Sequence, residues 1–139
     1  MTKDEELSRY MALIEYYKEQ LSLLDTQMSY VQAAMNDYAK AKITVDHLQQ
    51  QEKDAELVMP IGGSTFVYAK AADPAKVLFD IGSGIVTEKT AEDAMKKIDE
   101  RIEQLQQTQE KLSSMIQQVQ TEAQEVSEKA QKLATEQNR

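Results

Sequence analysis

The residues that could take part in catalysis or bind a metal ion are few and scattered. His47 is the only histidine, and Asp46 and Glu52 are carboxylates near it in the sequence. A lone imidazole in a polar helical stretch lacks the further ligands of a metal site and the nucleophile of a catalytic triad. The absence of cysteine excludes disulfides and thiol catalysis. We therefore expect no catalytic residue, no metal site and no enzymatic activity.

One glycine-rich segment could in principle bind a phosphate group. Residues 82–84, Gly-Ser-Gly, begin like a dinucleotide-binding fingerprint. That fingerprint needs a third glycine and a helix directly after it, whereas this segment lacks the glycine and continues into a strand-like run. We interpret it as a tight turn and expect no cofactor.

The segment 55–89 is the one part of the chain that is typical of β-strands. It contains all four glycines, both prolines and both phenylalanines, and its short apolar runs are separated by turn-forming residues. The pattern predicts two β-hairpins, with strands at residues 56–61 and 65–71 in the first and at residues 76–81 and 85–89 in the second.

These four strands carry apolar residues on both faces, which two narrow helices cannot cover. A lone hairpin is marginally stable, and its open edges pair readily with other chains. The segment is therefore predicted to be an oligomerisation module that completes a sheet or barrel with other subunits. The predicted interface residues are Val58, Phe66, Tyr68, Val77, Phe79 and Ile85.

The segment 1–54 has the apolar heptad repeat of a coiled-coil helix. One series is Leu7, Ile14, Leu21, Met28 and Met35, and the second is Tyr10, Tyr17, Leu24, Val31, Tyr38 and Val45. Residues at these spacings lie on one face of a helix and form a seam with a partner helix. Lys42 interrupts the first series, and a polar residue at such a position usually fixes the register.

The segment 90–139 is predicted to be the second coiled-coil helix. Thr90 followed by Glu92 and Asp93 is an N-terminal capping pattern. The heptad positions that follow are Met95, Ile98, Ile102, Leu105, Gln109, Leu112, Ile116, Val119, Ala123, Val126, Ala130 and Leu133. The two helices are expected to fold back on each other within one chain, which brings Tyr10 near Leu133.

A second apolar row lies outside the seam of the first helix, at Leu13, Tyr16, Leu23 and Tyr30. Such residues can simply rest on a helix surface, because isolated exposed apolar side chains are normal. They can also bind apolar surface on another molecule. The second interpretation gives candidate binding residues in this row and near the free helix ends: Leu7, Tyr10, Met11, Leu13, Tyr16, Leu23, Val126 and Leu133.

Composition limits the partners. The net charge of -8 is spread over the chain without a basic face. Nucleic acids and anionic membranes are therefore disfavoured as partners. No apolar run reaches the roughly 20 residues that span a bilayer, and the lack of cysteine fits a cytoplasmic location.

The strand segment resembles the alpha-class subunits of archaeal-type prefoldin. The similarity lies in the Val-x-Pro-x-Gly start at 58–62, the Phe-Val pair at 66–67, the second hairpin at 77–89 and the acidic helix start at 90–93. The order of helix, two hairpins and helix extends it to the whole chain. The implied fold is α+β and mainly α, a long antiparallel coiled coil whose helices are joined by two β-hairpins that complete an oligomeric β-barrel.

The resemblance also implies a function. Prefoldin is an ATP-independent chaperone, a holdase, in which two alpha and four beta subunits form a hetero-hexamer. Its coiled coils hold non-native client proteins at their tips and pass them to a group II chaperonin. The alternative is a structural coiled-coil scaffold or dimerisation adaptor without chaperone activity, which leaves the strand segment unexplained.

Overall fold

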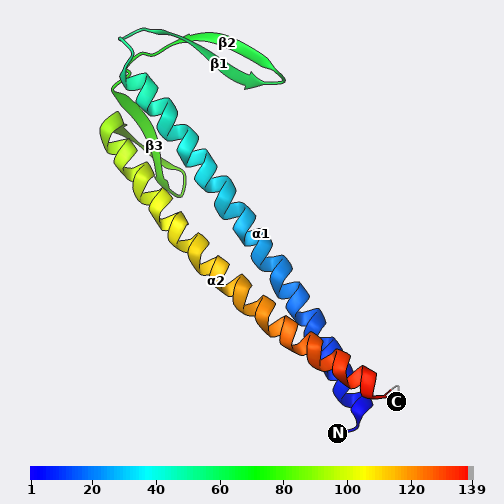
Figure 1. Ribbon diagram of the computed structural model, residues 1–139. Helices are drawn as coiled ribbons and strands as arrows, with labels where there is room; N and C mark the ends of the chain where they lie inside the picture. The colour runs from blue at the N-terminus through cyan, green and yellow to red at the C-terminus, as the bar shows by residue number, and fades with distance from the viewer. Residues whose placement is uncertain (138–139) are drawn as a thin grey trace. The chain divides into compact units, whose positions relative to one another are not determined.

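The computed structural model describes residues 1–137 and contains two helices joined by four strands (Figure 1). The elements are α1 (Lys3–Gln49), β1 (Glu56–Gly62), β2 (Thr65–Lys70), β3 (Lys76–Gly82), β4 (Ile85–Thr90) and α2 (Ala91–Gln137). The predicted order of helix, two hairpins and helix is confirmed. Residues 138 and 139, the end of the predicted C-terminal segment, lie outside the described residues.

The chain divides into two compact units. The first contains Met1–Ala34 and the part of α2 that begins at Leu105. The second is Met35–Gln104, which contains the end of α1, both hairpins and the start of α2. All the candidate binding residues of the helices belong to the first unit, and all the predicted interface residues belong to the second.

Both helices begin at a threonine cap. The backbone N–H of Glu5 donates to Thr2 Oγ1 at 3.2 Å, and the N–H of Asp93 donates to Thr90 Oγ1 at 3.1 Å. Acidic side chains fill each first turn, where they interact favourably with the positive end of the helix dipole. The predicted Thr90 cap is confirmed, and Thr90 is also the last residue of β4.

The two hairpins have the same construction. In each, an antiparallel pair contains an irregularity just before the turn, at 60–62 in β1 and at 80–82 in β3. Both central turn residues have positive φ, 58° at Gly63 and Ser64, and 53° and 76° at Ser83 and Gly84. This is the turn geometry that matches strand twist in two-residue hairpins. Gly62 and Gly82 accordingly belong to the strands and not, as the sequence suggested, to the turns.

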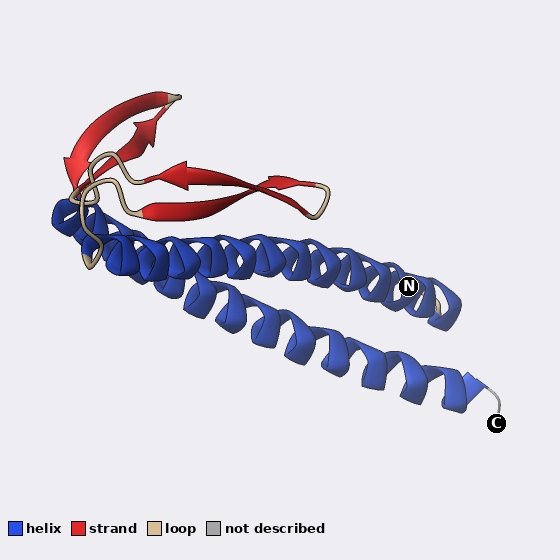
Figure 2. Ribbon diagram, turned by 90° about the horizontal axis from the view of Figure 1, so that it is seen from above, coloured by secondary structure: helices blue, strands red, loops and turns tan. Residues whose placement is uncertain are grey.

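The hairpins form two separate sheets, and they are placed differently in the second unit. Seen from above, they point in different directions (Figure 2). The β3–β4 hairpin contacts α2 through Arg101, whereas the β1–β2 hairpin extends away from the end of α1 (Figure 1). Their roots are tied by short backbone hydrogen bonds. Asp54 N–H donates to Ala71 O at 2.7 Å, and Ala91 N–H donates to Ala75 O at 2.7 Å.

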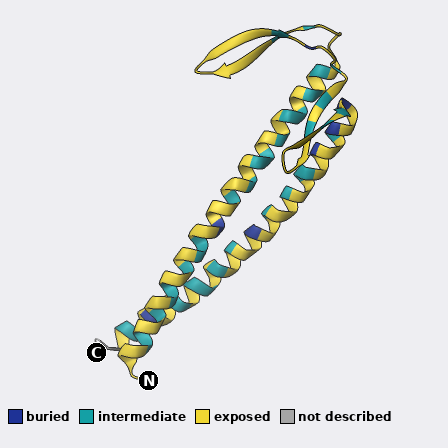
Figure 3. Ribbon diagram, turned by 180° about the vertical axis from the view of Figure 1, so that it is seen from behind, coloured by how far each residue is buried: buried dark blue, intermediate teal, exposed yellow. Residues whose placement is uncertain are grey.

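The apolar core is a narrow seam in each unit (Figure 3). Leu24, Leu112 and Ala130 are buried in the first unit, and Ala71, Ala91, Ala94 and Ile98 are buried in the second. The remaining predicted heptad positions are partly covered, as expected of a two-helix coiled coil. Neither helix contains, within residues 1–137, a stretch apolar enough to cross a membrane.

Leu24 and Leu23 allow a matched test of this seam. Leu24 is 5% exposed and Leu23 is 53% exposed. Leu24→Ala is expected to lower the free energy of unfolding by about 2 kcal/mol, because it removes buried methyl groups and leaves a cavity. Leu23→Ala is the control and should change it by less than about 0.5 kcal/mol. Urea denaturation followed by circular dichroism measures both, and equal effects would contradict the assignment of the seam.

Candidate functional site

The β1–β2 hairpin exposes apolar side chains on both of its faces. Val58 pairs with Tyr68 and Pro60 with Phe66 on one face, and Met59 pairs with Val67 on the other. Tyr68 is 91% exposed, and Val58, Phe66 and Met59 are each more than half exposed. Exposed apolar surface of this kind marks an interaction site. Val58, Phe66 and Tyr68 are therefore accessible to another chain, as an interface residue must be.

The β3–β4 hairpin is covered on one face only. Val77, Phe79, Thr87 and Lys89 are partly covered, and they share a face because they alternate along paired strands. Leu78 on the opposite face is 75% exposed, and Val86 on the same face is also exposed. Ile85 beside the turn is exposed as well.

Sequence reasoning missed Leu78 and Val86 as candidate interface residues. It selected Val77 and Phe79, which lie on the face that is partly covered within this chain. The period of two shows which residues share a face, but it does not show which face the helices cover. Lys76, Asp80 and Glu88 share the outer face with Leu78, so their charges were the available signal for that face.

An ion pair joins the two helices of the second unit. Lys42 Nζ lies 2.6 Å from Asp99 Oδ1, with both side chains about half exposed. An exposed pair of this kind contributes less than about 1 kcal/mol to stability. It gives Lys42, the residue that interrupts the heptad series of α1, one partner on α2 and so favours a single register.

In the first unit, α1 carries the exposed apolar row. Tyr16, Leu23 and Tyr30 are exposed, with Tyr30 at 74%, whereas Leu13 is partly covered. Gln20 and Gln27 interrupt the row at its helical spacing, and both side chains are uncharged. On the described part of α2, Met115 is the one large apolar side chain that is exposed. The apolar surface of this unit therefore belongs mainly to α1.

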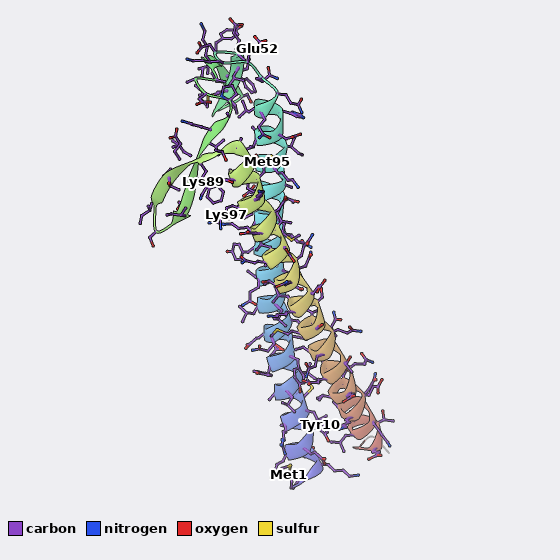
Figure 4. All side chains as sticks on the ribbon, turned by 90° about the vertical axis from the view of Figure 1, so that its left-hand side faces the viewer. Met1, Tyr10, Glu52, Lys89, Met95 and Lys97 are labelled. Atoms are coloured by element: carbon purple, nitrogen blue, oxygen red, sulfur yellow. The ribbon has the colours of Figure 1, made fainter. Side chains whose placement is uncertain are left out.

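Most of the candidate residues near the helix ends are less exposed than the residues of the row. Tyr10 lies close to the start of α1 (Figure 4). Tyr10 and Leu133 line a common hollow of about 290 Å³, so their expected proximity is confirmed. Leu7 and Val126 are also partly covered, and Met11 is exposed. The Tyr10 hydroxyl donates to Glu6 Oε1 at 3.3 Å. Partial burial, and then the Glu6 carboxylate, raise the pKa of the Tyr10 hydroxyl above its ordinary value.

The residues first considered for chemistry stay apart. His47 is exposed on the last turn of α1, and residues 82–84 form part of the β3–β4 turn. Among residues 1–137, histidine, aspartate and glutamate side chains do not gather in a group that could hold a metal ion. What the described residues offer is therefore two apolar surfaces, one in each unit.

Comparison with known proteins gives consistent results. A family model described as "Prefoldin subunit" matches residues 17–136. Prefoldin subunit alpha of Archaeoglobus fulgidus is 30% identical over 110 residues, which cover 79% of this chain and 80% of that protein. Prefoldin subunit alpha of Methanosarcina barkeri is 32% identical over 105 residues, which cover 73% of each.

Two solved structures share the fold. A cryo-EM structure of filamentous PFD from Methanocaldococcus jannaschii has a TM-score of 0.57 at 21% identity, covering 88% of this chain and 95% of that one. The crystal structure of the prefoldin beta subunit from Thermococcus strain KS-1 has a TM-score of 0.60 at 18% identity, covering 91% and 90%. At these identities the likeness establishes the fold alone.

Proposed function

This chain belongs to the prefoldin family, and from that premise we propose that it is an alpha-class subunit of an ATP-independent chaperone. In this proposal it joins beta-class subunits in a cytoplasmic hexamer of two alpha and four beta chains. The assembly holds non-native proteins and passes them to a group II chaperonin. The observation that carries the proposal is the exposure of apolar residues on both faces of the β1–β2 hairpin.

The hairpins supply the assembly surface. A two-stranded hairpin is marginally stable alone, and one with open edges and two apolar faces gains most by pairing with further strands. Strands from other subunits that close into a barrel with this hairpin cover its edges and the face that points into the barrel. Val58, Phe66, Tyr68 and Ile85 supply exposed apolar surface for this contact, together with Leu78 and Val86.

The helices supply the holding surface. An unfolded client offers scattered apolar segments without a fixed shape, so binding has to add several weak contacts on separate arms. Tyrosine suits such contacts because its ring is apolar and its hydroxyl tolerates water. We assign the main contacts to the row on α1. Leu7, Tyr10, Met11, Val126 and Leu133 near the helix ends are the second set.

Assembly through the β1–β2 hairpin is tested by Phe66→Glu. A charge at this side chain is expected to weaken association with a beta-class subunit by at least about tenfold, because burying Phe contributes about 1.5–3 kcal/mol. Native mass spectrometry of mixtures measures the association. Gln32→Glu changes the net charge equally on an exposed helix position and should assemble normally. Normal assembly of Phe66→Glu would contradict the proposed interface.

The holding role of the row is tested by replacing Tyr16, Leu23 and Tyr30 with serine. Because all three are exposed, helix content and assembly should stay unchanged. Suppression of the aggregation of a denatured model protein should need about tenfold more of the assembled chaperone.

The matched control replaces Gln106, Gln117 and Gln131 on the exposed surface of α2 with serine. It makes the same number of serine substitutions in a helix without removing apolar surface, and it should behave as wild type. Undiminished protection by the α1 variant would exclude the row and leave the residues near the helix ends as the holding site. Failure of the wild-type assembly to protect any denatured protein would favour the scaffold alternative.

A further inference from the structure

Arg101 joins three elements of the second unit through one guanidinium group. Its Nη1 donates to the Tyr38 hydroxyl of α1 at 2.9 Å, and its Nη2 donates to the Asp80 carbonyl of β3 at 3.2 Å. Its Cζ lies 4.8 Å from the centre of the Phe79 ring. Arg101 itself is on α2, so a single side chain connects both helices to the β3–β4 hairpin.

This arrangement depends on the chemistry of arginine. The planar guanidinium donates from two different nitrogens at its edge while its face lies over an aromatic ring. A lysine ammonium is a compact point charge and cannot reproduce both edge contacts and the stacking. Because Arg101 is partly covered and none of these partners is a carboxylate, the contacts differ from an ordinary surface ion pair.

The root of the β3–β4 hairpin is joined to the start of α2. The N–H of Ala91, the first residue of α2, donates to Ala75 O at 2.7 Å, just before β3 begins. Toward the other end of β3, Arg101 donates to the Asp80 carbonyl, close to the hairpin turn. The hairpin is therefore held at both its root and its far end.

The β1–β2 hairpin serves as an internal comparison. Its register matches that of β3–β4 position for position, and the place of Phe79 is taken by Met59, which is 51% exposed. This hairpin has the same bulge and turn but extends away from the end of α1 (Figure 1). Hairpin geometry alone therefore does not cause docking.

We propose that Arg101 is a positioning residue, which holds the β3–β4 hairpin on the chain's own helices and so determines which face a partner meets. The inner face of Phe79 and Val77 is held by this chain, and the outer face of Leu78 and Val86 is left for the neighbouring subunit. The β1–β2 hairpin enters assembly with both faces free. The identity of the neighbour rests on the proposed function, whereas the docking itself does not.

Hydrogen exchange of the full-length chain, measured by mass spectrometry, tests the docking. Arg101→Gln is expected to raise the exchange rate of residues 76–90 about tenfold and to leave residues 56–70 unchanged. Arg101→Lys should not restore protection, and Tyr38→Phe, which keeps the ring and loses the hydroxyl, should have a smaller effect in the same direction. Lys97→Gln is the control, because Lys97 makes an exposed ion pair with Glu100 on the same helix.

The outcomes separate positioning from general stability. Faster exchange confined to β3–β4, with the urea midpoint of the helices unchanged, supports the proposal. The proposal would be overturned if Arg101→Gln exchanged like the Lys97→Gln control, or if it raised exchange equally in both hairpins. Full protection in Arg101→Lys would overturn it as well. Failure of the wild-type chain to assemble with a beta-class subunit would refute the proposed function and leave the exchange result intact.

Discussion

A seam between two helices is too narrow to cover four apolar strands, and the rest of the structure follows from this constraint. The buried leucines and alanines form a narrow seam within each unit, and no polar or charged side chain is buried among the described residues. The strands therefore keep apolar surface that the chain cannot cover by itself. One hairpin is partly covered by docking on the helices and the other stays open on both faces, so the two identically built hairpins are prepared for different contacts.

The sequence predicts the parts of the fold that depend on local rules. The heptads identified Leu24 and Leu112 as seam residues, and the capping pattern identified Thr90 as a helix start, because period and side-chain hydrogen bonding are both local. Local patterns could not show whether Phe79 or Leu78 lies on the face of β3 that the helices cover. It depends on Arg101, whose contacts with Tyr38 and Asp80 bring distant parts of the sequence together.

For the candidate surfaces too, sequence spacing gives some properties, whereas others depend on packing against distant residues. The row on α1 could be recognised from its spacing, yet Leu13 is partly covered while Tyr30, left out of the main set of candidates, is the most exposed member. Helix periodicity gives the angle of a residue around the axis. The exposure of a residue on α1 also depends on the size of the α2 side chains that pack beside it.

Thr90 is both the last residue of β4 and the cap of α2, so the hairpin continues directly into the helix. There is no loop at this joint to absorb a change in length. One inserted residue would turn the seam of α2 by about 100° relative to the hairpin, since a helix has 3.6 residues per turn. Between α1 and β1, by contrast, residues 50–55 form an irregular connection. Length changes during evolution should therefore accumulate at the first joint and be absent from the second.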